Sequence, residues 1–189
     1  MNMAFVRSLV AALAVLTAGC GSIHNVVADG ADRQLMLRGN DPVAYHTMGK
    51  AVRGDPAIKA EHEGLQYHFV STAHREQFLR SPARYVPAYT GFCSSGTPFA
   101  LKANIGADTF KIVDGRLYLF GSQRSRRNWE LDEKENIKLG DWYWENETKN
   151  VPFRLQNFKR YTFRVAHYKK DAELDAEYIK RYGKLPESK

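Results

Sequence analysis

The chain has 189 residues and a formal net charge of +7, with 43% apolar and 26% charged residues. These fractions are ordinary for a globular protein, so they exclude wholesale disorder. If a leader of about 20 residues is removed, about 170 residues remain, enough for one domain or for one small domain with an elaboration.

The first 20 residues have the three parts of a secretory signal. Arg7 precedes an apolar run at 9–16, and small residues at 17–19 precede Cys20. The charge-free stretch, 8–23, falls short of the roughly 20 predominantly apolar residues that cross a bilayer. Its end resembles the lipobox of bacterial lipoproteins, which predicts that Cys20 carries the lipid. An ordinary signal peptide that contains a cysteine by chance is the alternative.

The residue after Cys20 bears on destination. Gly21 stands where an aspartate would retain a lipoprotein in the inner membrane, by resemblance to the sorting rule of enteric bacteria. We therefore expect an exported protein that is lipid-anchored to the cell envelope, at the outer membrane and facing the periplasm, with residues 20–33 as a tether. Cys93 is then a lone thiol in an oxidising compartment.

The first regular elements after the tether are predicted to be a hairpin and a helix. A strand at 57–62 is followed by Glu63-Gly64 and by a strand at 65–70, in which apolar and polar residues alternate. Ser71-Thr72 then predicts an N-cap for a helix over 73–79.

A second hairpin carries the strongest turn signal in the chain. A loop at 91–98 precedes it, and Asp114-Gly115 separates strands at 109–113 and 116–120. Ser122 predicts the cap of a charged helix that runs to about residue 136. No internal repeat is evident from the sequence.

The last part of the chain, 146–189, is interpreted as a basic C-terminal β/α extension. Trp142 and Trp144, and then the aromatic residues over 153–168, predict β structure. Asp171 predicts the cap of a final helix. From 149 to 170 there are seven Lys or Arg residues and no Asp or Glu. The favoured interpretation is a solvated strand face, and the alternatives are attraction to anionic lipid head groups or to an envelope protein partner. Nucleic acid is not expected as a partner of an exported protein.

Several separated motifs, in order, resemble the YHS domain family, and most closely its exported YHS-domain (seleno)protein branch. They cover roughly residues 34–145 and comprise residues 37–45, 49–54 and 67–71, then Arg75, Phe78, Pro82 and Tyr85, then residues 89–93, 111–119 and 129–130. The resemblance implies an α+β fold, with a small antiparallel sheet and short helices. It also implies a functional position at Cys93, where some members carry selenocysteine.

The chain departs from the metal-handling members of that family. Ala44, Val70 and His74 stand where those members have cysteines. A structural zinc site needs four Cys or His ligands. A copper or zinc site for a transition-metal cofactor would therefore have to be assembled by tertiary convergence, with His46, His68 and His74 as the candidate ligands together with Cys93. Read singly, His68 is a solvent-face strand residue and His74 lies in the first turn of a helix.

Cys93 is the best single candidate for chemistry. It lies in a loop rich in Gly and Ser, where a redox or nucleophilic thiol and a small buried hydrophobic residue are evenly weighted interpretations. We expect a periplasmic binding or thiol-redox accessory module. The alternatives are a metal-binding or metal-delivery module and a non-catalytic structural envelope protein.

Overall fold

The computed structural model describes residues 21–186, so the predicted signal peptide and the lipidation site at Cys20 lie outside the described residues. The strands are β1 (Val27–Asp29), β2 (Asp32–Leu35), β3 (Asp55–His62), β4 (Leu65–Phe69), β5 (Gly106–Val113) and β6 (Arg116–Phe120). The α-helices are α2 (Pro42–Thr47), α3 (Thr72–Arg80), α4 (Pro82–Tyr85), α5 (Gln123–Glu130), α6 (Glu133–Tyr143), α7 (Phe153–Thr162) and α8 (Asp171–Tyr182). Tighter or wider helical turns are η1 (Met36–Gly39), η2 (Ala88–Gly91), η3 (Thr97–Phe99) and the π-helical η4 (Trp144–Thr148).

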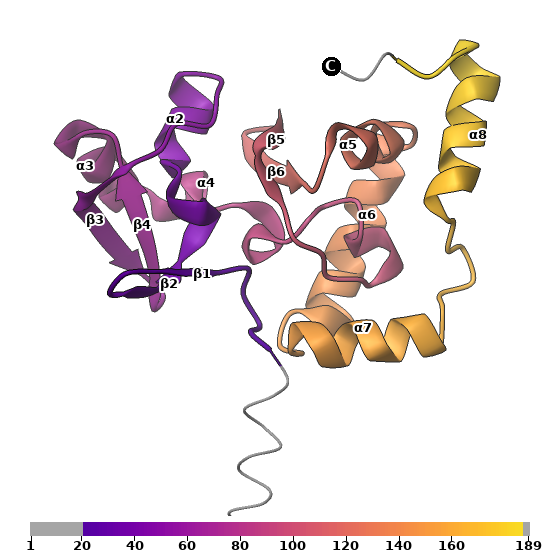
Figure 1. Cartoon of the computed structure of the whole chain (residues 1–189), viewed down its shortest axis with the longest axis horizontal. Coiled ribbons are helices and arrows are strands. Elements are labelled where there is room, and N and C mark those ends of the chain that lie inside the picture. The colour runs from indigo at the N-terminus through magenta and orange to yellow at the C-terminus, as the bar shows by residue number, and fades with distance from the viewer. Residues whose placement is uncertain (1–20, 187–189) are drawn as a thin grey trace, which may run out of the picture.

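The strands form two sheets, which lie side by side in Figure 1. The larger has the order β1-β2-β4-β3, and its β2–β4 pair is parallel, so this sheet is mixed where an antiparallel one was expected. Its first two strands come from the segment that was expected to be a tether. A hairpin uses that segment because Leu35 is buried in the core when β2 pairs with β4.

Both predicted hairpins are confirmed. β3 pairs antiparallel with β4, and β5 with β6. The central turn residues have positive φ, 51° and 74° at Glu63-Gly64 and 50° and 77° at Asp114-Gly115. Positive φ at both central positions is the geometry of a tight hairpin turn, and glycine at the second position adopts it without steric cost.

The two hairpins belong to two copies of one structural unit, which corrects the expectation of no internal repeat. We define the first unit as residues 36–80 and the second unit as residues 88–130. Each begins with a turn in which two non-glycine residues and a glycine have positive φ, ending at Gly39 and at Gly91. Each continues through a hairpin into a helix capped by a serine side chain, Ser71 or Ser122.

The registers of the two hairpins match in detail. Asp55 pairs with Phe69 in the first unit, and Gly106 pairs with Phe120 at the corresponding place in the second. A register shift follows at once in both, before Lys59 in β3 and before Phe110 in β5. Because a bulge displaces one strand at a defined position, its recurrence at the same place indicates the same fold in both units.

The core lies between the units and beneath their helices. Phe78 of α3 is fully buried against Tyr67 and Phe69 of the first unit. Trp129 of α5 stands at the corresponding place in the second unit, packed on Tyr118 and Phe120. Each helix therefore inserts one aromatic side chain onto its own hairpin, and such a buried aromatic contributes several kcal/mol.

The C-terminal extension is helical, so the predicted β structure there is wrong. The helix predicted from Ser122 to about residue 136 divides into α5 and α6, and η4 and α7 occupy the region where aromatic residues predicted strands. Trp144 is buried against Tyr89 and Phe92, and this packing outweighs the β propensity of the aromatic residues. The final helix is confirmed as α8, although its cap position is Lys170 and Asp171 lies in its first turn.

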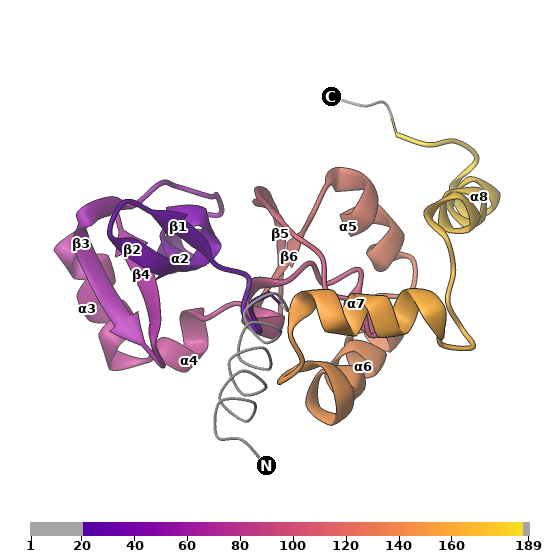
Figure 2. The same cartoon turned by 60° about the horizontal axis from the view of Figure 1, so that its bottom comes forward.

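The extension wraps the second unit. α7 lies along one edge of the molecule and α8 stands at the end remote from the four-stranded sheet (Figures 1 and 2). Gly140 lets α6 approach closely, because a Cβ there would lie 2.7 Å from Thr97 Oγ1 and from Tyr89 Oη. This close contact brings α6 against the loop that holds Cys93.

Candidate functional site

Cys93 lies at the start of the loop between η2 and η3, with 2% of its surface exposed. Its backbone N–H donates to the carbonyl of Ala103 at 2.9 Å, which fixes the loop. Its Sγ accepts a hydrogen bond from the backbone N–H of Gly121 at 3.2 Å, and lies 3.1 Å from the hydroxyl of Ser95. The sulfur is therefore buried but has two polar partners, which a merely hydrophobic cysteine does not need.

Asp41 occupies the corresponding place in the first unit. Its carboxylate accepts from the backbone N–H of Val70 at 2.9 Å, and Val70 precedes the cap of α3 as Gly121 precedes the cap of α5. The same carboxylate accepts from the N–H of Val43 at 2.8 Å and so caps α2. The backbone that surrounds Cys93 is thus the counterpart of a backbone that holds a buried carboxylate.

The two sites differ in what covers them. In the first unit His74 lies over Asp41, with Nδ1 2.7 Å from the carboxylate. The corresponding residue in the second unit is Ser125, whose short side chain hydrogen-bonds to Ser122 instead. The smaller residue leaves space beside the cysteine, and Ser125 lines the pocket found there.

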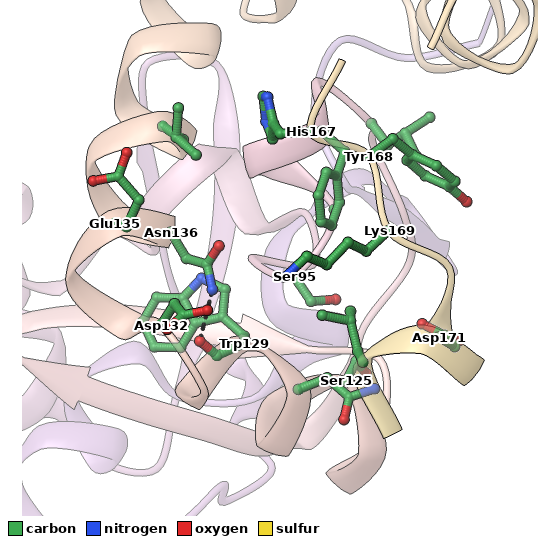
Figure 3. A pocket seen from close by; sticks show the side chains of 16 residues that line it. Ser95, Ser125, Trp129, Asp132, Glu135, Asn136, His167, Tyr168, Lys169 and Asp171 are labelled. Atoms are coloured by element: carbon green, nitrogen blue, oxygen red, sulfur yellow. Dashed lines mark hydrogen bonds between the residues drawn. The ribbon is translucent and has the colours of Figure 1, made fainter. Parts of the chain in front are cut away.

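That pocket has a volume of about 410 Å³, within the range of small-molecule sites. It is bounded by α5, α6 and η3 on the inner side, and by the 167–169 segment and α8 on the outer side (Figure 3). Ser95 is part of its wall, so the residue whose hydroxyl contacts Cys93 Sγ also lines the pocket. The extension therefore has a structural role, because its residues close the pocket.

The pocket offers apolar surface and hydrogen bonds rather than unpaired charge. Asp132 forms an ion pair with Arg181, and Lys169 forms one with Glu177. The indole N–H of Trp129 has no hydrogen-bond partner among the described residues, although the residue is 2% exposed. A buried donor without an acceptor is costly, so a ligand with a hydrogen-bond acceptor suits this wall.

The three candidate metal ligands are held by separate partners. His68 is not on a solvent face: it is 1% exposed, and its Nε2 lies 2.8 Å from Asp32. His74 lies in the first turn of α3, as predicted, and contacts Asp41. The ring of His46 meets Tyr85 edge-on, and burial lowers the pKa of this histidine. Within residues 21–186, no group of three or more His, Cys, Asp or Glu side chains could hold a metal ion.

Lys102 is a buried lysine whose ammonium group has partners of its own. Its Nζ donates to the carbonyls of Val151 at 2.7 Å and Ile23 at 3.1 Å. It also lies over the rings of Phe92 and Trp144. Burial lowers the pKa of Lys102 to about 8. The side chain joins the beginning of the chain to the segment before α7.

Sequence reasoning singled out Cys93 but missed the pocket beside it. Ser95 was visible as part of a Gly/Ser loop, and Ser125 and Trp129 as part of the charged helix after Ser122. No spacing rule brings the loop and the helix together. The one available signal was the alignment of the two units, which places Cys93 on Asp41 and Ser125 on His74.

No family model, curated protein or solved structure matches the chain. Within the described residues, none of the helices is both long enough and apolar enough to cross a membrane.

Proposed function

We propose that the protein is a membrane-anchored, YHS-like envelope lipoprotein whose pocket binds a small molecule beside a redox-active Cys93. The supporting observation is the backbone that surrounds Cys93, which we call its cradle. Sγ accepts a hydrogen bond from the Gly121 N–H, at the place where the first unit holds the carboxylate of Asp41. Ser95, whose hydroxyl contacts Sγ, lines a pocket of about 410 Å³. The resemblance of residues 34–145 to YHS domains supports the same position.

The chemistry that suits a single thiol is reduction of a small hydroperoxide. The thiolate attacks the distal oxygen, the O–O bond breaks, and the leaving alkoxide takes a proton to become an alcohol. Cys93 becomes a sulfenic acid. Two molecules of an external thiol then return it to the thiol, releasing water and a disulfide. No second cysteine is needed, which agrees with a chain whose other cysteine is assigned to lipid.

Ser95 has two roles in this proposal. Its hydroxyl contacts Sγ, and the same residue lines the pocket. A serine side chain changes rotamer on a picosecond to nanosecond scale when space is available, and the pocket supplies that space. Rotation of Ser95 exposes the sulfur to a ligand in the pocket without unfolding the loop.

The test is alkylation of Cys93 by iodoacetamide, a small neutral amide, at neutral pH, followed by mass spectrometry of the peptide that contains Cys93. We expect the folded protein to be modified within the time that the unfolded chain requires in urea. Leu139→Trp, which fills the pocket from α6, is expected to slow the reaction by at least about tenfold. The matched control is Leu79→Trp, at an exposed leucine of α3.

Two outcomes would overturn the proposal. Alkylation that occurs only after unfolding would show that Cys93 is a packing residue. An equal rate in Leu139→Trp and Leu79→Trp would show that the reagent does not reach the thiol through the pocket.

The lipid anchor is tested separately. Incorporation of labelled palmitate into the full chain in bacterial cells is expected, and Cys20→Ser is expected to abolish it. Unchanged incorporation in Cys20→Ser would refute lipidation at this residue and leave the pocket proposal untouched.

A further inference from the structure

The inner face of α7 is fixed to the body by polar side chains. Gln156 is fully buried and donates to a backbone carbonyl at 2.7 Å. Asn157 exchanges two hydrogen bonds with the backbone of Lys102, at 2.9 and 2.7 Å. Arg160 forms an ion pair with Glu147. These contacts determine which side of the helix faces outwards.

The outer face of α7 carries large apolar side chains in solvent. Leu155, Phe158 and Tyr161 are 50%, 72% and 60% exposed, and Phe163, just beyond the helix, is 70% exposed. The first three are spaced by three residues, so they share one side of the helix. Single exposed apolar residues are ordinary, but a contiguous group of them marks an interaction site. We call these four residues the α7 apolar face.

The chain segment that carries the α7 apolar face has basic residues and no acidic ones. Residues 149–170 contain seven Lys or Arg and no Asp or Glu. Arg154 and Lys159 stand on the helix beside the exposed side chains. Lys159 is half exposed and lies 3.4 Å from Glu147, whereas Arg154 forms no ion pair with a carboxylate of residues 21–186. Basic residues bordering aromatic and aliphatic ones are the composition of a helix that lies in the interface of an anionic membrane.

The path of the chain places this face beside the proposed anchor. The N–H of Phe153, the first residue of α7, donates to the carbonyl of Ser22 at 3.0 Å. Gly21 lies against the side chain of Arg154. Figures 1 and 2 both show the described chain beginning next to the start of α7. A membrane attachment at residue 20 or before it would therefore hold α7 close to the bilayer.

We propose that the α7 apolar face binds the surface of an anionic lipid bilayer, with the aromatic rings at the level of the head groups and with Arg154 and Lys159 against the phosphates. The orientation relies on attachment through the N-terminal segment, as in the proposed function.

The test is a fluorescence measurement on the full chain with Cys20→Ser and Cys93→Ala, so that lipidation is not required and the introduced cysteine is the one that bimane labels. Bimane is attached to Phe158→Cys, and the protein is mixed with vesicles of phosphatidylcholine alone or with added phosphatidylglycerol, each containing brominated lipid. We expect quenching on the anionic vesicles. Each of Arg154→Gln and Lys159→Gln is expected to weaken binding of this face about fivefold. The matched control carries bimane at Leu79→Cys, an exposed position on α3.

Sedimentation of the vesicles distinguishes the possible failures. If the protein sediments but bimane at 158 and at 79 is quenched equally, the α7 apolar face has no preferred contact with lipid and this proposal is wrong. Absence of quenching at 158 on anionic vesicles that carry the protein refutes it as well, as does binding of this face to an oligonucleotide in preference to vesicles. None of these results bears on alkylation of Cys93.

Discussion

The two units have the same backbone and different sites. In the first unit the cradle holds Asp41, which is covered by His74, and every partner is internal. In the second unit the cradle holds Cys93, whose sulfur contacts the hydroxyl of Ser95, and Ser95 lines a pocket. Ser125 of α5 stands where α3 has His74, and this shorter side chain lines the pocket. The two units therefore differ because one has a structural cap at this place and the other has a candidate site. The difference teaches that the fold supplies the cradle and that the side chains decide its use.

The two units also differ in how a pair of corresponding lysines is buried. Lys50 and Lys102 stand at corresponding positions, yet Lys50 is exposed and Lys102 is 1% exposed. The extension covers the second unit and brings the carbonyls of Lys149 and Val151 to the ammonium group. The first unit has the sheet edge formed by β1 and β2 instead. Each unit therefore recruits different chain segments onto the same framework.

The largest expected effect comes from the aromatic side chain that each helix inserts on its hairpin. Phe78→Ala and Trp129→Ala are each expected to lower the free energy of unfolding by about 4 kcal/mol, through lost transfer energy and the cavity left behind. Urea denaturation followed by circular dichroism measures both. Phe158→Ala, at an exposed aromatic of α7, is the control and is expected to change stability by less than about 0.5 kcal/mol. A small loss in only one of the buried pair would show that the two units are not equivalent in packing.

The second-largest expected effect is a difference in stability between substitutions of Asp41 and of Cys93. Asp41→Ala removes the acceptor of several buried N–H groups and leaves His74 unpaired, so we expect a loss of about 3 kcal/mol. Cys93→Ala is expected to lose about 1 kcal/mol, because a small side chain with fewer partners is removed. The same urea titration compares them. Equal losses would mean that Cys93 is as structural as Asp41, which argues against a functional thiol.

The smallest effect is a pH dependence. Burial lowers the pKa of Lys102 to about 8 in the folded protein, while a lysine in the unfolded chain keeps a pKa of about 10.4. Between these values the unfolded chain binds more protons, so stability rises with pH through this window. Wild type is expected to gain roughly 1–2 kcal/mol relative to Lys102→Met from pH 7 to 9.5.

Lys50→Met is the matched control for this measurement, since Lys50 is exposed. Its stability is expected to follow wild type over the same pH range. The difference from wild type is the quantity to compare, because tyrosines such as Tyr89, whose pKa burial raises, affect all variants alike near pH 10. A pH profile of Lys102→Met that runs parallel to wild type would contradict the assigned role of burial.

Local signals in the sequence predicted the elements whose causes are local. The Glu63-Gly64 and Asp114-Gly115 turns and the Ser71 and Ser122 caps act within a few residues, and all are present in the structure. The prediction for the 153–168 segment failed because β propensity of aromatic residues depends on the surface against which they pack. There Gln156 and Arg160 face the body, while Phe158, Tyr161 and Phe163 face solvent.

The sequence by itself determined the export signal to be tested, the two hairpins, their helix caps and the choice of Cys93 as the thiol to examine. Only the tertiary structure decided that Cys93 lies in the cradle that holds Asp41 in the other unit, that Ser125 leaves space beside it, and that the extension closes a pocket there. The physical reason is range: turns and caps depend on neighbouring residues, whereas a pocket depends on side chains brought together from distant segments.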